Sequence, residues 1–382
     1  MAQISFSEPE PRLGGKLKML PWFFILMVLV AGLAGGGALY SAANGSFMPW
    51  AKPHLIRFGI SIAVMLAFGL VDIRVWYRLA YPTYLLMLAL LAGVEVAGKV
   101  GAFGAQRWIN LGFVQIQPSE LMKIALVMAL ARYFHPRLPD EVRQLRTLVV
   151  PVLMILAPTA FVLLQPNLGT SIMLMMAGAA MLFVAGTRIW LFVVVAVAGA
   201  AAAPVAWHSM HGYQKRRVMT FLDPSVDPLG AGYHITQSRI ALGSGGLFGK
   251  GFLNGTQSHL NFLPEKQTDF IFPLIAEEWG LWGGAALLGL FALMSYYGVG
   301  VGLRSRSQFG RMLAIGLSVN LFLYVFINTA MVMGLIPVVG VPLPLISYGG
   351  TSMLAVMMGF GMLISVLIHR DIKISRRYPL GD

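Results

Sequence analysis

The sequence of 382 residues contains no cysteine, so disulfide bonds and thiolate metal sites are excluded. It also contains no P-loop, no G-x-S-x-G motif and no dinucleotide-binding fingerprint. Its 7 histidines are scattered along the chain, and their spacing does not indicate a zinc site. Only 11% of the residues are charged, and 15 residues are acidic. Each carboxylate that falls within an apolar region is therefore informative.

Hydrophobic residues make up 57% of the chain, and its mean hydropathy of +0.74 lies outside the range of soluble proteins. Apolar runs of about 20 residues recur, which is the length needed to span a hydrocarbon core of about 30 Å. The N-terminal region has no signal-peptide pattern, because its first apolar run is too long and lacks a small-residue cleavage site. These features predict an all-α polytopic membrane protein whose first apolar run is retained.

The apolar runs predict about ten transmembrane helices in a single domain, residues 20–369, between short polar tails at 1–19 and 370–382. We expect a large extracytoplasmic loop, residues 209–269, between the seventh and eighth helices, with a short amphipathic helix near 232–242. The segment 98–118 is also too long to be a simple connector. The expected helices cover residues 20–43, 54–72, 75–97, 119–134, 147–165, 168–186, 189–208, 270–301, 311–336 and 345–369.

The formal net charge of +13 first suggests a nucleic-acid partner, but the distribution of the charges argues against one. Most of the Lys and Arg residues outside the large loop fall on the side that holds the two tails. That asymmetry is the positive-inside bias of membrane proteins. We therefore expect both termini in the cytoplasm, the loop 209–269 in the periplasm, and no interaction with nucleic acid.

Acidic residues gather where the large loop meets the eighth helix. Ionised carboxylates inside a bilayer cost about 2.5–3.5 kcal/mol on insertion scales, so they are rarely there without a task. Asp269 is expected to open the helix behind Thr268 as N-cap, and helical spacing places Glu277 on nearly the same side, where we expect it to bind substrate. Asp269 could also merely complement the positive helix N-terminus, and Glu278 is expected in a buried hydrogen bond or salt bridge. The group comprises Glu265, Asp269, Glu277 and Glu278.

A second polar group begins the fourth expected helix. Glu120 and Lys123 are three residues apart and share a helical face. They are either a structural ion pair or part of a polar wall on which Lys123 holds an anionic substrate group. Arg107 and Trp108 precede them, and Trp108 is either a membrane anchor or a ligand contact.

Two irregular segments are further candidates for the surroundings of a site. The stretch 165–170, QPNLGT, is typical of a tight turn between the fifth and sixth helices. The stretch 342–351, PLPLISYGGT, predicts a broken entry into the last helix. Such backbone is tolerated at membrane depth only where it packs in protein or lines a wet cavity. We therefore expect it, with Ser347, to form a wall of the same site as Asp269.

Four motifs in this order resemble the SEDS family (shape, elongation, division and sporulation): QRWINLGFVQIQPSELMK, LLQPNLGTS, LNGTQSHLNFLPEKQTDFIFPLIAEEWG and PLPLISYGGTS. The resemblance covers nearly the whole chain and is stronger to the elongation members than to the division members. One departure is visible, because the family commonly has Asp where this chain has Asn167. An essential acid at that position is therefore not expected here.

The resemblance implies a peptidoglycan glycosyltransferase of the cell inner membrane that polymerises lipid II, the undecaprenyl-linked disaccharide-pentapeptide, during cell elongation and rod-shape maintenance. It implies a class B penicillin-binding protein, a transpeptidase, as partner, together with other membrane proteins of the elongation complex. The family's catalytic aspartate maps onto Asp269, and its important polar residues map onto Arg107, Trp108, Glu120 and Lys123.

The chemistry of glycosyl transfer fits this assignment. An acceptor hydroxyl must lose a proton to a general base, here Asp269, as it attacks an anomeric carbon. The leaving pyrophosphate needs positive charge, from Arg107, Lys123 or Lys266, or from a divalent cation such as Mg²⁺ or Mn²⁺. Two alternatives remain open, a transporter that flips lipid II and a non-catalytic scaffold that recruits a cell-wall synthase.

Overall fold

The computed structural model describes residues 13–97, 108–110, 115–209, 212–223, 230–260, 262 and 265–375, and these are mainly helical. Ten long helices lie at the ten expected places in the sequence. They are α2 (Trp22–Ala42), α3 (Ala51–Leu70), α4 (Ile73–Ala97), α5 (Pro118–Phe134), α7 (Leu145–Leu164), α8 (Leu168–Ala185), α9 (Ile189–Ser209), α13 (Ile271–Arg304), α14 (Gln308–Val332) and α15 (Gly350–Ile368).

The last two helices differ from the prediction at the ends that face each other. α14 ends at Val332, and Gly334 beyond it has a left-handed φ of 70°. The last helix begins at Gly350 and not at residue 345, because Ser347 and Tyr348 bond the chain before α13 and are held out of a helix. The segment between the two helices is therefore irregular.

By length and composition, eight of the described helices could cross a membrane: α2, α3, α4, α7, α8, α13, α14 and α15. The 17-residue α5 is slightly too short for that criterion and carries charged side chains. The apolar part of α9 covers Ile189–Ala202. Nearly every residue of α5 is buried against other helices, and the charged side chains of Glu120 and Lys123 face protein.

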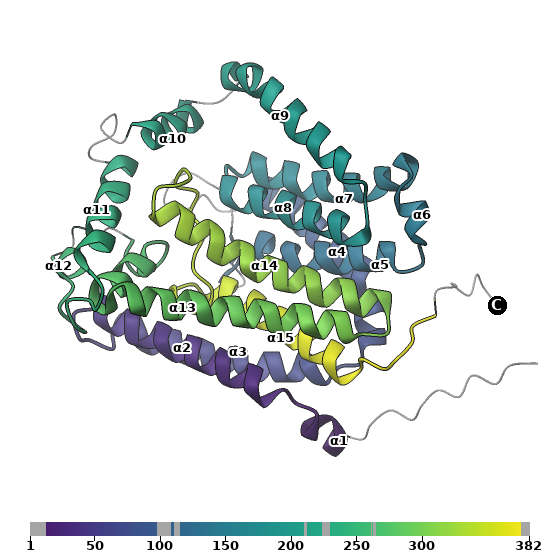
Figure 1. The fold of residues 1–382 in the computed structure, drawn as a ribbon, viewed down its shortest axis with the longest axis horizontal. Helices are drawn as coiled ribbons and strands as arrows, with labels where there is room; N and C mark the ends of the chain where they lie inside the picture. Colours follow the sequence, from purple (N-terminus) through teal and green to yellow (C-terminus); the bar gives the residue numbers. More distant parts are fainter. Residues whose placement is uncertain are drawn as a thin grey trace, which may run out of the picture.

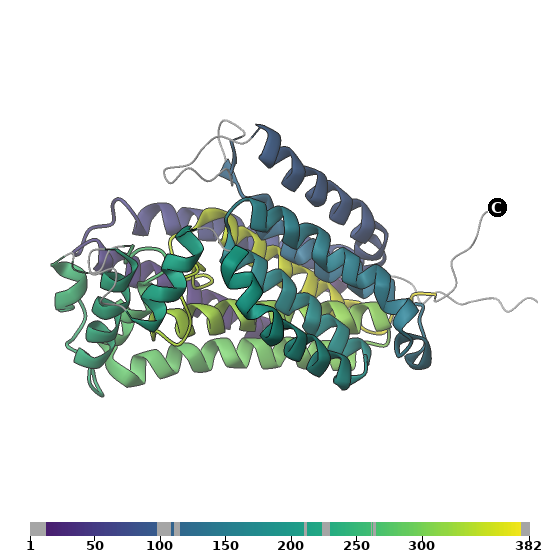
Figure 2. The ribbon, with the colours of Figure 1, turned by 90° about the horizontal axis from the view of Figure 1, so that it is seen from above.

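The centre of the bundle is formed by α5, α14 and α15. α15 packs along α3, α13 packs along α14, and α5 contacts α4, α8 and α14 (Figures 1 and 2). Most residues of α14 and α15 are buried, whereas α9 exposes apolar side chains along its length. In Figure 1, α9 and α10 (Gly212–Leu222) form an arc outside the bundle, which leads to α11 (Ala231–Ser244).

Two ends of the bundle can be distinguished. At one end, Lys16 of α1 (Leu13–Lys18) donates to the carbonyl of Leu70, and Arg306 N donates to the carbonyl of Arg370. Ser365 of the last helix donates to the carbonyl of Val71, next to Leu70, so the described segments nearest the two termini lie at the same end. At the other end, Ser41 of α2 meets Glu278 near the start of α13. The chain before α13 lies at this second end.

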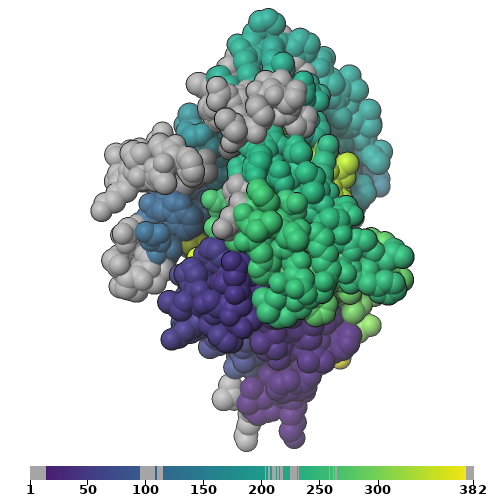
Figure 3. All heavy atoms as spheres, turned by 90° about the vertical axis from the view of Figure 1, so that its left-hand side faces the viewer, coloured from purple at the N-terminus to yellow at the C-terminus, as the bar shows by residue number. Residues whose placement is uncertain are grey.

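The loop 209–269 contains helical structure of its own. α11 confirms that a helix lies near 232–242, but its apolar residues are not gathered on one face, so the expected amphipathic character is wrong. α12 (Thr256–His259) follows it. Figure 3 looks onto the second end of the bundle, where the green part of the chain covers much of the face beside the purple α2. A small antiparallel pair, β1 (Ile109–Asn110) and β2 (Gln115–Ile116), precedes α5, and a short α6 (Pro139–Val142) follows it.

Candidate functional site

Asp269 lies in a turn, residues 265–270, directly before α13. The helix begins at Ile271 with Phe270 in the N-cap position, so the expectation that Thr268 caps a helix opened by Asp269 is wrong. The Thr268 hydroxyl instead donates to the carboxylate of Glu265 at 2.8 Å. Since Asp269 precedes the helix, helical spacing does not align it with Glu277. The side chain of Asp269 is half-buried.

The irregular segment before α15 holds this turn from one side. The Ser347 hydroxyl donates to the carbonyl of Thr268 at 2.6 Å and accepts from the N–H of Leu343 at 2.8 Å. The N–H of Tyr348 donates to the carbonyl of Gln267 at 2.7 Å. The expected proximity of this segment to Asp269 is confirmed. The proton of the Ser347 hydroxyl holds the turn, and the bond from Leu343 orients that hydroxyl within its own segment.

The backbone of Asp269 itself is fixed by α14. The buried side-chain amide of Asn328 donates to the carbonyl of Asp269 at 2.9 Å and to that of Val341 at 2.7 Å. The carboxylate passes Gly340, where an added Cβ would lie 3.4 Å from Asp269 Oδ2. One amide thus ties together the turn, α14 and the irregular segment, and it does so without using the carboxylate.

One cation belongs to the turn, and a second lies beside the segment that holds the turn. Lys266 is buried, its ammonium lies 5.9 Å from the centre of the Trp50 ring, and burial lowers the pKa of its side chain. Arg57, an exposed residue of α3, lies over the Tyr348 ring at 4.8 Å. Arg57 was not among the expected site residues. Its position near the start of α3, at the same end of the bundle as Asp269, is the only sequence signal for it.

Glu120 and Lys123 form a buried ion pair in α5. The ammonium of Lys123 lies 2.7 Å from Glu120 Oε1, and the two side chains are 1% and 6% exposed, Lys123 being the more buried. The Tyr324 hydroxyl donates to Glu120 Oε2 at 2.5 Å, and Lys123 lies 4.1 Å from the centre of the same ring. The geometry is that of the ion pair that we expected as one alternative, the other being a polar wall that contacts substrate. Substrate contacts of Glu120 and Lys123 stay a prediction that requires the pair to open.

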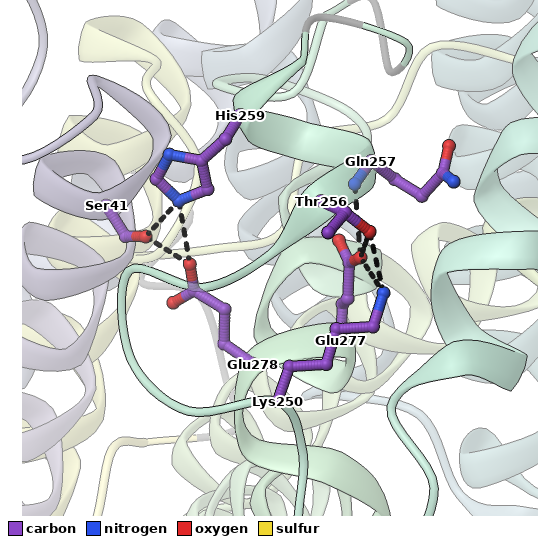
Figure 4. A network of polar contacts seen from close by, with 7 residues as sticks. All are labelled: Ser41, Lys250, Thr256, Gln257, His259, Glu277 and Glu278. Atoms are coloured by element: carbon purple, nitrogen blue, oxygen red, sulfur yellow. Dashed lines mark hydrogen bonds and ion pairs between the residues drawn. The ribbon is translucent and has the colours of Figure 1, made fainter.

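Glu277 and Glu278 are also buried, and both contact the loop (Figure 4). Lys250 lies 2.6 Å from the carboxylate of Glu277, whose side chain is 0% exposed. Direct substrate binding by Glu277 stays a prediction that this burial does not favour. Glu278 accepts from Ser41 and lies 3.3 Å from His259, which confirms the buried bond expected for it.

Three other residues singled out in the sequence, Arg107, Trp108 and Asn167, precede α5 or α8 along the chain. Arg107 falls outside the described residues, and Trp108 is 41% exposed beside β1. β2 is joined to the last helix because Thr351 donates to the carbonyl of Gln115 at 3.1 Å. Asn167 caps α8 by accepting from the N–H of Thr170 at 3.3 Å, so turn chemistry accounts for this position.

The described part of the chain contains no cluster of three or more His, Asp or Glu side chains that could hold a metal ion. Mg²⁺, however, is commonly held by one or two carboxylates together with substrate phosphates. A single carboxylate, that of Asp269, would be enough for a magnesium ion that is also held by substrate phosphates. The arrangement can therefore supply one half-buried carboxylate, two nearby cations and a firmly held backbone.

The chain matches the family model described as "Cell cycle protein", of FtsW, RodA and SpoVE proteins, over residues 17–372. It is 43% identical over 347 residues to the "Peptidoglycan glycosyltransferase MrdB" of Escherichia coli K12, covering 91% of this chain and 93% of that protein. It is 36% identical over 323 residues to "Stage V sporulation protein E" of Bacillus subtilis, covering 83% and 86%.

Solved structures show the same fold. A structure described as "Structural coordination of polymerization and crosslinking by a peptidoglycan synthase complex" superposes with a TM-score of 0.80 at 30% identity, covering 92% of this chain and 98% of that chain. The Rod shape determining protein RodA of Thermus thermophilus superposes with a TM-score of 0.67 at 27% identity, covering 92% and 97%. The expected fold class, a mainly helical protein with several membrane-length helices, is confirmed.

Proposed function

Since this chain belongs to the FtsW, RodA and SpoVE family of cell cycle proteins, we propose that it is a peptidoglycan glycosyltransferase in which Asp269 is the general base. The observation that carries the role of Asp269 is its setting. Its backbone is held by Asn328 and the turn around it by Ser347, while its side chain is half-buried and takes no part in these bonds. Names of relatives associated with rod shape support a role in cell elongation.

The reaction joins two sugars through an oxygen atom. Asp269 accepts the proton of the acceptor hydroxyl as that oxygen attacks the anomeric carbon of the donor. The new carbon–oxygen bond forms while the bond from the anomeric carbon to the lipid pyrophosphate breaks, with inversion at that carbon. A positioned base contributes about 10²–10⁴-fold to such a step.

The leaving pyrophosphate carries the negative charge that develops in this step. Lys266 belongs to the turn that carries Asp269, and Arg57 lies over the ring of Tyr348, whose N–H bonds that turn. These two cations are therefore our candidates for stabilising that charge. Fixed cations in a site with little water are worth more than the same charges in bulk water. A divalent cation, Mg²⁺ or Mn²⁺, would be the alternative source of positive charge, and Asp269 would be the residue that holds it.

The proposed orientation puts the termini in the cytoplasm and Asp269 at the periplasmic face of the inner membrane. It rests on the positive-inside bias and on the separation of the two ends of the bundle. The segments nearest the termini lie at one end, and the turn of Asp269 lies at the other. Lipid II that has reached the outer leaflet would present its sugars at this second end.

The proposed partner is a class B penicillin-binding protein that cross-links the new strands. The structural relative named as a peptidoglycan synthase complex supports a partner of this kind, since polymerisation and crosslinking are both in its description. Other membrane proteins of the elongation complex are further proposed partners. Lipid II is the proposed substrate.

Polymerisation in detergent tests the proposed function against its two alternatives. The purified protein, with and without its transpeptidase partner, is given lipid II in micelles, and glycan strands are resolved on gels. A glycosyltransferase forms strands under these conditions, whereas a transporter has no second compartment to deliver to. The partner alone is the control. Absence of strands with the partner present would favour a transporter or a scaffold.

Lys266 gives the reaction an expected pH dependence. Because burial lowers the pKa of Lys266, its positive charge is fully present at low pH and is lost as the pH rises through that lowered value. Polymerisation should therefore decline on the alkaline side. Lys266→Arg should move the decline to higher pH, since the Arg side chain stays charged, and Lys266→Met should lower the rate by about 10²-fold. Coincident pH–rate profiles for the unaltered protein and Lys266→Arg would exclude this role.

A further inference from the structure

The helix that follows Asp269 is interrupted at Gly280. This residue has φ 67° and ψ −165°, which lies outside the helical region, although α13 continues to Arg304. An interruption of this kind removes the hydrogen bonds that normally join the carbonyl of one residue to the N–H four positions later. Unpaired backbone groups are strongly disfavoured at membrane depth. Something must replace the lost bonds.

The loop before α12 supplies the replacement. The carbonyl of Glu277 accepts from the N–H of Lys250 at 3.0 Å, and that of Glu278 accepts from the N–H of Gly251 at 3.0 Å. On the other side of the interruption, the N–H groups of residues 281 and 282 donate to the carbonyls of residues 246 and 247, at 2.9 and 3.3 Å. In an unbroken helix these four backbone groups would bond one another. Here they bond the loop segment of residues 246–251 instead.

The close approach depends on glycine on both sides. Gly280 has a left-handed φ, and an added Cβ there would collide with the backbone of Leu247 and Gly249. A Cβ at Gly249, whose φ is 82°, would collide with the carbonyl of Glu278. The interruption at Gly280 and the loop segment 246–251 therefore approach closely only because both positions are glycine.

Glu277 extends the contact to its side chain. Its Oε1 accepts from the Lys250 ammonium at 2.6 Å, the Thr256 hydroxyl at 3.0 Å and the N–H of Gln257 at 3.1 Å. Lys250 also donates to Thr256 at 2.8 Å. One buried oxygen of Glu277 thus binds both the first turn of α12 and the loop segment 246–251.

Glu278 points to another side of α13, as Figure 4 shows. Its Oε1 accepts from the Ser41 hydroxyl and from His259 Nε2, which lies at 3.3 Å. Ser41 belongs to α2 and His259 ends α12. Two consecutive carboxylates therefore bind both ends of α12, and one of them also binds the end of α2.

We propose that Glu277 and Glu278 are positioning residues, which hold the loop on α13 and thereby fix the turn that carries Asp269. The inference rests on the proposed function of Asp269. The contact of His259 with Glu278 joins residues 19 positions apart, and Asp269 lies at the middle of the segment between them. Closing a segment at its two ends restricts the conformations of its middle. Neither carboxylate touches substrate in this role; both act through the loop.

The experiment measures rate and loop order together. Glu277→Gln and Glu278→Gln keep an oxygen acceptor of the same shape, and Glu277→Ala and Glu278→Ala remove it. The matched pair at the other side of the contact is Lys250→Arg, which keeps a charged donor, and Lys250→Met, which does not. Asp140→Ala, an exposed carboxylate between α5 and α7, is the control for a general charge effect. Each purified variant is assayed for kcat and KM with lipid II, for thermal unfolding, and for hydrogen exchange of residues 245–262.

We expect the Ala variants and Lys250→Met to lower kcat by about 10- to 100-fold, as small displacements of a reacting group do, with KM close to its original value. Amide exchange in 245–262 should rise, and Lys250→Arg should restore kcat. The unfolding midpoint should change little in the Gln variants, whereas Lys250→Met should also lower the midpoint, because it leaves the buried carboxylate of Glu277 without a cation. Faster exchange with unchanged kcat would overturn the inference and leave the proposed function intact. A parallel loss of kcat and of the unfolding midpoint in the Gln variants would also overturn it, because the carboxylates would then support the whole fold. Absence of polymerisation by the unaltered protein overturns the proposed function and this inference with it.

Discussion

Replacing Asp269 with Asn is expected to lower the rate of lipid II polymerisation by about 10²–10⁴-fold, since the amide cannot accept the proton of the acceptor hydroxyl. The fold should survive, because the bond from Asn328 reaches the backbone carbonyl of residue 269 and not its side chain. An amide also has nearly the same size as the carboxylate that passes Gly340. Strand formation from purified lipid II and the thermal unfolding midpoint are the two measurements.

The matched control is Glu265→Gln, which neutralises an exposed carboxylate in the same turn. Its partners, the hydroxyl of Thr268 and the amide of Gln267, can still bond an oxygen at that position. This variant should keep most of the activity. If Asp269→Asn polymerises lipid II as fast as the unaltered protein, Asp269 is not the base. Equal loss in both variants would point to the net charge of the turn instead.

The helices could be predicted from the sequence because each depends on a local property, the length of an apolar run. Their ends were harder to place where the chain leaves the bundle. The last helix starts at Gly350 because Ser347 and Tyr348 bond the turn of residues 265–270, and no local pattern announces that contact. The eighth helix begins at Ile271, one residue after the expected 270, but Asp269 does not open it, since the chain around Asp269 is held from α14.

The candidate site could be located but not assembled. The presence of carboxylates in an apolar region identified Asp269, Glu277 and Glu278 as candidates. It did not predict which residues they would contact. Those partners come from α2, α12 and α14, which are distant in the sequence. The ion pair in α5 also has a partner that the sequence did not predict. The hydroxyl of Tyr324, which bonds Glu120, lies 204 positions from it in the sequence.

Lys123→Met is expected to destabilise the protein by about 3–5 kcal/mol, the usual effect of removing one partner of a buried ion pair. The substitution keeps a side chain of similar length, but it takes the ammonium away from the carboxylate of Glu120, which is 6% exposed. The hydroxyl of Tyr324 still donates to that carboxylate but carries no charge to balance it. The measurement is the thermal unfolding midpoint of the purified protein in detergent, compared with that of the unaltered protein.

The double variant Glu120→Gln with Lys123→Met decides what the pair is for. A glutamine side chain is not charged and still offers an oxygen to Tyr324, so the double variant should regain most of the stability that Lys123→Met loses. If it also polymerises lipid II, the pair is structural, and the alternative in which Lys123 holds an anionic group of the substrate is excluded. Recovered stability without recovered polymerisation would reverse that conclusion, because the ammonium would then be needed for the reaction and not for the fold.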